Sequence, residues 1–400
     1  MSDGLILELA VVMIGAAGLA VLAGVARQPI IIAYVLAGVL FGPHSPWPAL
    51  RMVQHIDFIR NAGALGLVLL LFLLGMVLHP DRLLKMFRQA SLTTLATSVA
   101  FFGIGFAAVA GVSAAAPTVY PLTAIEAVYV GFAVAFSSTL LVVKLLPTRR
   151  LHESAVGTLV IGILIVQDAL AILVLMVMAF WTAARGGDTG VYWKVPLGLG
   201  MLAAAFPVEQ YALRRLMRKV ETYPELLLVL SLAWCLLFAE AARGLGFSRE
   251  IGAFVAGLAI ARSPISLYIW EKVAPLRDFF IVLLFFSLGA MVNVADTLAV
   301  LPLAAGLALV LAILKPRLFR AALRIEGTPR ALAREAGWRL GQSSEFALVI
   351  AFLALQFGHI GQTAFELILV TTLLSFIIST YVVVLKYPTP LGVSEGLRQA

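Results

Sequence analysis

The sequence predicts an all-α integral membrane protein of about thirteen transmembrane helices, built from two inverted-topology repeats. Of its 400 residues, 62% are hydrophobic and only 12% are charged, whereas soluble proteins have about 45–50% apolar and about 25% charged residues. Hydrophobic stretches of about 20 residues, the length that crosses a bilayer as a helix, recur from Gly4 to Lys386. Short patterns also recur at a constant offset of seven such stretches, which indicates an internal duplication.

Hydrophobic stretches separated by charge clusters mark the predicted helices. They lie at about 4–25, 29–43, 62–79, 89–112, 123–147, 155–181, 192–210, 223–242, 248–262, 276–295, 300–322, 335–356 and 361–385. We expect a single membrane transport domain over residues 1–400. No Lys or Arg precedes Arg27, so the first stretch lacks the basic region of a signal peptide and is predicted to be the first helix.

The distribution of basic residues predicts the orientation. With the N-terminus outside, 21 of the 29 Lys and Arg residues fall in cytoplasmic segments and six in external ones. Cytoplasmic loops of membrane proteins carry such an excess, so the N-terminus is predicted outside and the C-terminus in the cytoplasm. The net charge of +8 is thereby explained by topology, and a nucleic-acid partner is not expected.

Three pairs of short patterns define the repeats. IAYVLAG at 32–38 resembles GAFVAG at 252–257, FLLG at 72–75 resembles FSLG at 286–289, and SSTLLV at 137–142 resembles SSEFALV at 343–349. Because the offset of seven helices is odd, the second copy enters the membrane from the opposite face, as in many secondary transporters. Repeat 1 is predicted over about 4–181, a linker helix over about 192–210 and inverted repeat 2 over about 223–385.

Asp168 is the strongest candidate for a functional residue. It lies mid-way along the predicted helix 155–181, where nothing else is ionisable, and a charge at that depth costs at least about 2.5–3.5 kcal/mol. A carboxylate there can hold either a proton or a monovalent cation; the alternative is a structural acid paired with a neighbouring helix. Gln167 beside it could offer an amide oxygen to the ion or simply face another helix.

Two hydroxyl clusters occupy matching positions in the two repeats. Their residues are Ser137, Ser138 and Thr139 in the first and Ser343, Ser344 and Glu345 in the second. Such clusters at mid-membrane depth favour unwound helices whose carbonyls and ends bind a cation. The alternatives are hydroxyls bonded back to their own continuous helices and, for Glu345, a structural partner of Lys315 or Arg339.

Lys315 has two interpretations. It could be a fixed positive charge that balances the carboxylates of the site, or it could extend to the cytoplasmic surface. The acids Glu126 and Glu366 are near helix ends and are predicted to be interfacial. The single cysteine, Cys235, can form no internal disulfide, and no phosphate-binding, H-E-x-x-H or Cys/His metal motif occurs. We therefore expect neither an enzyme nor a cofactor.

Four segments together resemble the membrane domain of Kef-type potassium/proton antiporters, of the monovalent cation:proton antiporter-2 superfamily. They are QPIIIAYVLAGVLFGP at 28–43, FSSTLLVVKLL at 136–146, GILIVQDALAILVL at 162–175 and GQSSEFALVIAF at 341–352. The resemblance implies a sodium/proton antiporter-like fold in which the fifth and twelfth helices are broken and cross near Asp168. It also implies a mobile core over about 89–181 and 300–385, with the rest forming a homodimeric scaffold.

The same resemblance implies the activity. It indicates electroneutral exchange of K⁺, or alternatively Na⁺, for protons by elevator-type movement in the bacterial inner membrane, with Lys315 matching a lysine that relatives often carry. Kef systems usually continue into a cytoplasmic nucleotide-binding domain, whereas this sequence runs about fifteen residues past the last predicted helix. A regulatory domain or subunit absent from this chain is one expectation. The alternatives are a sodium-coupled solute symporter and a gated cation channel, although no TVGYG-like filter is present.

Overall fold

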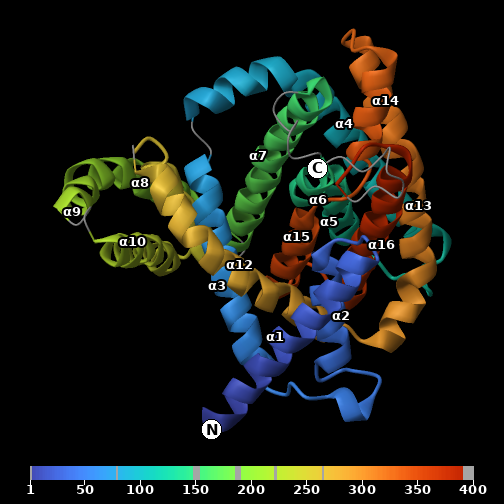
Figure 1. Cartoon of the computed structure of the whole chain (residues 1–400), viewed down its shortest axis with the longest axis horizontal. Coiled ribbons are helices and arrows are strands. Elements are labelled where there is room, and N and C mark those ends of the chain that lie inside the picture. Colours follow the sequence, from blue (N-terminus) through green and yellow to red (C-terminus); the bar gives the residue numbers. More distant parts are fainter. Residues whose placement is uncertain are drawn as a thin grey trace. The chain divides into compact units, whose positions relative to one another are not determined.

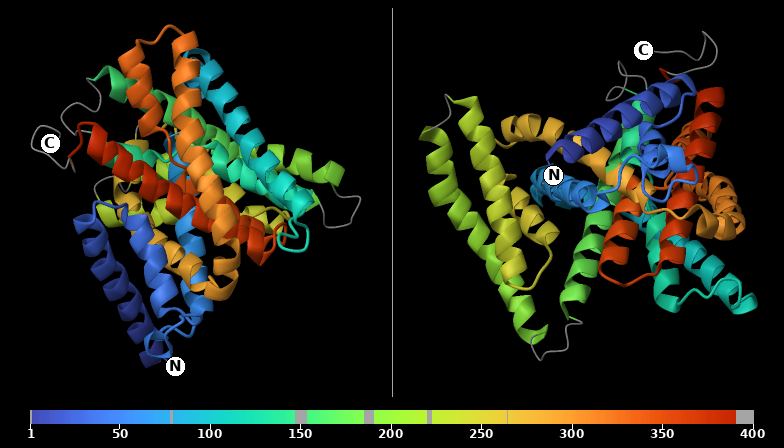
Figure 2. Two further views of the ribbon diagram at one scale, coloured as in Figure 1. Left: turned by 90° about the vertical axis from the view of Figure 1, so that its right-hand side faces the viewer. Right: turned by 90° about the horizontal axis from the view of Figure 1, so that it is seen from below.

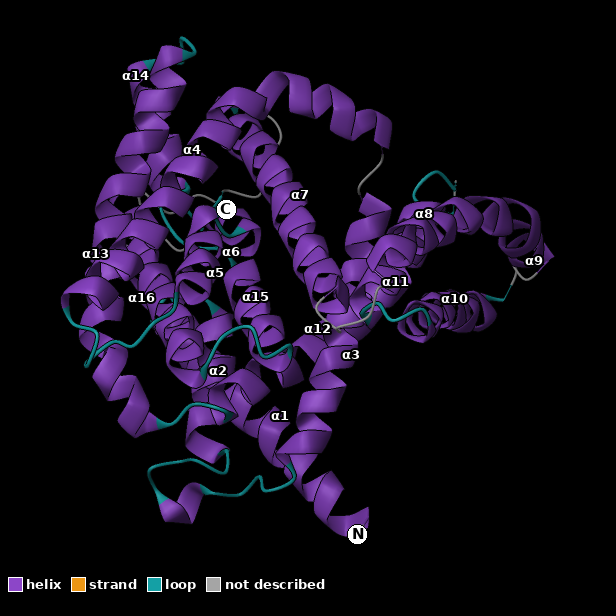
Figure 3. Ribbon diagram, turned by 180° about the vertical axis from the view of Figure 1, so that it is seen from behind, coloured by secondary structure: helices purple, strands orange, loops and turns teal. Residues whose placement is uncertain are grey.

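The chain forms helices joined by loops (Figures 1 and 3) in a computed structural model that describes residues 2–77, 80–146, 154–184, 191–219, 223–263 and 265–390. The first helices are α1 (Ser2–Val25), α2 (Ile30–Phe41), α3 (Ile56–Val77), α4 (Pro80–Ala115), α5 (Ala124–Ala135), α6 (Thr139–Leu145), α7 (Ala155–Ala184) and α8 (Val191–Val208). The others are α9 (Arg214–Lys219), α10 (Pro224–Gly244), α11 (Arg249–Ile260), α12 (Ser266–Ala290), α13 (Val294–Ile325), α14 (Arg330–Arg339), α15 (Glu345–Gln356) and α16 (Gln362–Lys386).

The helices confirm the predicted all-α membrane class. Each of the thirteen predicted ranges overlaps at least one helix, and those at 123–147 and 335–356 each cover an interrupted pair, α5 with α6 and α14 with α15. Nine helical segments within the described residues are long and apolar enough to cross a bilayer, and α2 and α15 are shorter apolar helices. The number of membrane crossings stays a prediction.

The prediction was wrong about where α12 begins. The sequence predicts a helix from about residue 276, but α12 starts ten residues earlier, at Ser266. The charged residues that suggested a loop lie within the helix instead: Arg277 donates hydrogen bonds to Asp278 at 2.7 and 3.0 Å, and its guanidinium lies 6.0 Å from the Trp270 ring centre. Long basic side chains can extend along a helix to reach water, so charge alone does not end a helix.

The described chain divides into two compact units. The first contains Met1–Leu9, His55–Leu84 and Leu173–Ser287, and the second contains Ala10–Gln54, Lys85–Ile172 and Leu288–Ala400. Every candidate site residue named above lies in the second unit. The predicted division into a mobile core and a scaffold remains a prediction.

In the first unit, α3 and α11 approach each other through glycines. A Cβ atom added to Gly75 would lie 2.4 Å from the Phe254 carbonyl oxygen, and one added to Gly257 would lie 2.0 Å from the Phe72 carbonyl oxygen. Neither distance is tolerated, so both positions require the absence of a side chain. Small residues of this kind let membrane helices pack backbone to backbone.

Gly257→Ala is therefore expected to destabilise the protein by about 2 kcal/mol, because the added methyl group must push the α3 backbone away. Thermal unfolding in detergent, followed by circular dichroism, measures the effect as a lower midpoint. Gly18→Ala in α1 is the matched control, since a Cβ there would meet no heavy atom within 4 Å. Equal midpoints for the two variants would contradict this account of the α3–α11 contact.

In the second unit, a buried apolar cluster holds short helices against long ones. The cluster contains Phe101, Val142, Leu146, Val160, Ile163, Leu164, Phe319, Leu323, Ala333, Ala336 and Leu340. These residues come from α4, α6, α7, α13 and α14 or from the residues directly after them, and Figure 2 shows α13 and α14 as adjacent helices. The cluster therefore fixes α6 and α14 beside α7, the helix that carries Asp168.

Candidate functional site

Two helices of the second unit are interrupted where the sequence predicts. The first stops at Ala135 and resumes at Thr139, and the second stops at Arg339 and resumes at Glu345. Ser138 accepts a hydrogen bond from the Leu141 N–H at 3.1 Å, and Ser344 accepts one from the Phe346 N–H at 3.1 Å. Both serines therefore cap the resumed helices, as N-cap hydroxyls do. The alternative of continuous helices with hydroxyls bonded back to the preceding turn is wrong.

The two interruptions lie against each other. The Ser137 hydroxyl donates to the Leu340 carbonyl oxygen at 2.8 Å, and the Gln342 side-chain amide donates to the Ser138 carbonyl oxygen at 3.4 Å. Figure 1 shows α5, α6 and α15 side by side in this region. The unwound segments of the two repeats thus form one polar region inside an apolar unit.

Asp168 and Gln167 of α7 both face this polar region. The Thr139 hydroxyl donates to Asp168 Oδ2 at 2.8 Å, whereas Asp168 Oδ1 is buried without a hydrogen-bond partner among the described residues. Gln167 is fully buried, and its amide oxygen accepts from the Ser137 N–H at 3.1 Å. That oxygen is therefore engaged with the first interruption, while Asp168 keeps one oxygen open.

Glu345 supplies a second carboxylate. One of its oxygens accepts from the Leu140 N–H at 3.4 Å, the Ser138 side chain also bonds to it, and its Oε2 is buried without a partner among the described residues. Glu345 therefore bonds to Leu140, the residue next to the Thr139 that donates to Asp168. The Ser343 hydroxyl is also buried and has no hydrogen-bond partner within the described part of the chain. Buried polar atoms are normally hydrogen-bonded, so this group of open oxygens calls for an explanation.

Lys315 joins the two interruptions. Its side chain is fully buried, and its ammonium donates to the Phe136 carbonyl oxygen at 2.8 Å and to the Gln342 carbonyl oxygen at 3.0 Å. The same nitrogen lies 5.1 Å from the centre of the Phe101 ring. Lys315 therefore does not extend to the surface, and it contacts backbone oxygens rather than Glu345. Its role as a balancing charge remains a proposal.

Glu126 and Glu366 are buried within the protein near the starts of α5 and α16, and their interfacial placement stays a prediction. Glu126 accepts a hydrogen bond from the Gly361 N–H at 2.9 Å. Glu366 accepts from the Asn293 N–H at 3.1 Å and from the Thr297 hydroxyl at 3.0 Å. Each carboxylate accepts hydrogen bonds from donors at helix ends. A position near the end of a predicted helix does not show whether an acid is buried in this way or exposed.

Sequence reasoning missed three polar residues of the region. The Ser343 N–H donates to the Ser375 hydroxyl at 3.0 Å, and the Ser379 hydroxyl donates to the Gln342 amide oxygen at 3.0 Å. Ser375 and Ser379 are four residues apart in α16 and so share one helix face. That spacing within an apolar stretch is the signal that could have identified them. Gln342 lay beside the predicted cluster without an assigned role.

Comparison with known proteins gives a family match over nearly the whole chain. The family model described as the transmembrane sodium/hydrogen exchanger matches residues 9–385. A protein of Alkalimonas amylolytica named as a candidate K(+) efflux antiporter, KefB, is 26% identical over 370 residues, which cover 90% of this chain and 53% of the relative. K(+) efflux antiporter 6 of Arabidopsis thaliana is 27% identical over 383 residues, which cover 93% of this chain and 62% of the relative.

A solved structure shares the fold. The sodium proton antiporter MjNhaP1 from Methanocaldococcus jannaschii matches with a TM-score of 0.62 and 16% identity, over 94% of this chain and 96% of that one. The chain therefore matches that structure over almost its full length, but spans only about half to two thirds of the length of the two curated relatives.

Proposed function

The chain belongs to the transmembrane sodium/hydrogen exchanger family, and from that premise we propose that it is a secondary antiporter that exchanges a monovalent cation for protons at Asp168. One observation carries the proposal. Among the residues that the structure describes, Asp168 Oδ1 and Glu345 Oε2 have no hydrogen-bond partner, and both are buried beside two adjoining helix interruptions. Carboxylate oxygens next to unwound segments are the ligands that secondary transporters offer to cations and protons.

Coupling follows from competition for one carboxylate. Asp168 can bind a proton or a cation at its open oxygen, and the Thr139 hydroxyl, which is both donor and acceptor, can serve either state. A bare carboxylate inside the membrane costs at least about 2.5–3.5 kcal/mol. The site is therefore favoured to move between the two faces of the membrane only when a proton or a cation neutralises Asp168. A cation carried in one direction is then exchanged for a proton carried in the other.

We propose K⁺ as the preferred cation and one proton per cation. The relatives named K(+) efflux antiporters support K⁺, whereas the structural neighbour is named a sodium proton antiporter, so Na⁺ is the second candidate. Electroneutral exchange is supported by Gln167, which places an uncharged amide rather than a second acid beside Asp168. The remaining ligands in this proposal are the residues of the two hydroxyl clusters.

The movement and assembly belong to the same proposal. We assign the mobile core to residues of about 89–181 and 300–385, moving in elevator fashion against a scaffold that forms a homodimer through α2 or α11. The N-terminus is external and the C-terminus cytoplasmic in an inner membrane. Cross-linking in native membranes tests the dimer, and a purely monomeric protein there would contradict it.

A flux measurement tests the activity itself. Protein reconstituted in liposomes with an imposed pH gradient and a trapped pH-sensitive dye is expected to move protons on addition of K⁺, and less with Na⁺, Li⁺ or Rb⁺. Valinomycin with equal K⁺ on both sides holds the membrane potential at zero. This treatment should leave the rate of proton flux unchanged if exchange is electroneutral. Dependence on an organic solute would instead support the symporter, and large uncoupled currents the channel.

A further inference from the structure

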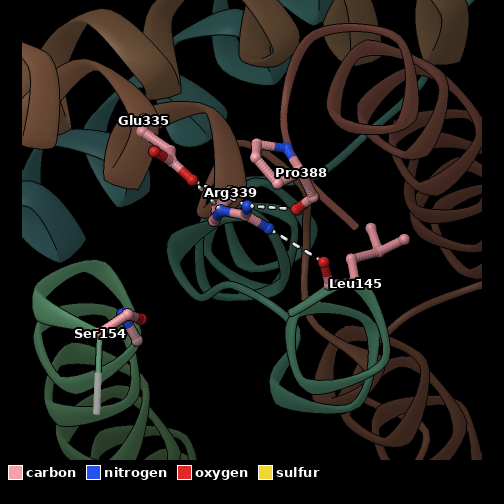
Figure 4. A network of polar contacts seen from close by, with 6 residues as sticks. Leu145, Ser154, Glu335, Arg339 and Pro388 are labelled. Carbon is pink, nitrogen blue, oxygen red and sulfur yellow. Dashed lines mark hydrogen bonds and ion pairs between the residues drawn. The ribbon is translucent and has the colours of Figure 1, made fainter. Parts of the chain in front are cut away.

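Arg339 is a buried arginine whose contacts reach three separate segments of the second unit (Figure 4). Only 2% of its side chain is exposed. It donates to Glu335 Oε1 at 2.8 and 2.9 Å, to the Leu145 carbonyl oxygen at 3.0 Å and to the Pro388 carbonyl oxygen at 2.8 Å. The planar fork of a guanidinium suits such simultaneous contacts, and a lysine could not reproduce them.

Two of the partners of Arg339 are backbone carbonyls at or just beyond the end of a helix. Leu145 is the last residue of α6, Pro388 lies two residues beyond the end of α16, and Arg339 itself is the last residue of α14. The carbonyl at the end of a helix carries partial negative charge, which a guanidinium satisfies well. Glu335, four residues earlier on α14, holds the guanidinium in place from its own helix.

The contact with Leu145 reaches the ion site through a short rigid element. α6 has seven residues, so it is about 10 Å long at the usual rise per residue. Its last residue bonds to Arg339, and its first residue, Thr139, bonds to Asp168 Oδ2. A shift of one end of a helix this short moves the other end by a similar amount.

A second path leads to the other interruption. Arg339 is followed directly by Leu340, whose carbonyl oxygen accepts the hydrogen bond from Ser137. The end of α14 is therefore joined to the chain at both ends of α6, through the guanidinium at Leu145 and through Leu340 at Ser137, two residues before Thr139. Both joints determine where Thr139 presents its hydroxyl.

We propose that Arg339 is a positioning residue of the ion site, which holds α6 at the height where Thr139 meets Asp168 and so sets the affinity for the transported cation. This inference rests on the proposed exchange function at Asp168. The carbonyl oxygen of Pro388 helps to hold the guanidinium, so the segment that follows α16 is connected to α6 through Arg339. Removing the guanidinium frees the end of α6 without altering any ligand.

Arg339→Gln tests the proposal, since glutamine is uncharged and cannot reach both carbonyls. In liposomes at one fixed pH, the concentration of K⁺ that gives half-maximal proton flux is expected to rise about fivefold, the size expected for the loss of about one hydrogen bond. The maximal rate per folded molecule should change less. Arg330→Gln on the exposed start of α14 is the matched control and should leave both values unchanged.

The outcomes separate a positioning role from a merely structural one. A folded Arg339→Gln protein with an unchanged half-saturating concentration overturns the proposal, whether or not its maximal rate falls. If that variant does not fold, Arg339→Lys decides: it keeps the charge and one carbonyl contact, and should raise the half-saturating concentration about twofold, whereas no change overturns the proposal. Wild-type protein without proton flux coupled to either K⁺ or Na⁺ would instead refute the exchange function itself.

Discussion

Asp168→Asn is expected to reduce cation-coupled proton flux at least about 100-fold, because the variant removes the carboxylate at which, in our proposal, proton and cation compete. Asparagine keeps the size of the side chain, and its amide oxygen can still accept the hydrogen bond from Thr139. The variant should therefore fold and insert normally. A neutral amide neither binds a proton at neutral pH nor supplies charge to a cation, so both halves of the exchange are lost.

The measurement is K⁺-driven proton flux in liposomes that contain equal amounts of folded protein. Asp296→Asn, the same substitution at an exposed residue in the first turn of α13, is the matched control and should retain full flux. Near-normal flux from Asp168→Asn would show that the proton travels elsewhere. Glu345 would then be the leading candidate, and Glu345→Gln should abolish exchange in its place.

The sequence predicted the helices because lipid imposes a simple requirement. An apolar stretch long enough to cross the bilayer must be helical to satisfy its own backbone, so the predicted ranges at 155–181 and 361–385 differ from α7 and α16 by at most three residues at either end. Where charge and helix coincide, as in α12, the same reasoning placed the start ten residues late. The hydroxyl clusters located both interruptions because a serine at an N-cap is a local feature of sequence.

What the sequence could not supply was the choice of partners across the fold. Lys315 lies in an apolar stretch with no acid nearby in sequence, and nothing there indicates that its ammonium bonds to Phe136 and Gln342, 179 and 27 residues away. Arg339 is separated from Leu145 by 194 residues. Backbone carbonyls are the same at every position, so only the fold determines which of them a buried cation will meet.

A substitution at Lys315 is expected to lower stability and transport together. In Lys315→Met, the two carbonyl oxygens that accept from the ammonium, those of Phe136 and Gln342, lose that donor in a buried setting. Each buried polar group left unsatisfied costs about 1–3 kcal/mol. Relief from burying the ammonium offsets part of this cost, so we expect a net loss of about 2 kcal/mol.

Transport should fall by more than this loss of stability alone would cause. The two carbonyls belong to the two interruptions, which Lys315 holds together. Once the interruptions separate, Asp168 and Glu345 no longer adjoin one polar region, and the region no longer contains the buried ammonium. Thermal unfolding and K⁺-driven flux measure the two effects, and Lys272→Met, at an exposed lysine of α12, is the matched control. A Lys315→Met protein that unfolds at the wild-type midpoint would mean that water or rearranged backbone can replace the ammonium. In that event the role of Lys315 is electrostatic rather than structural. The reduction in K⁺-driven proton flux of Lys315→Met would then measure the contribution of its positive charge to transport.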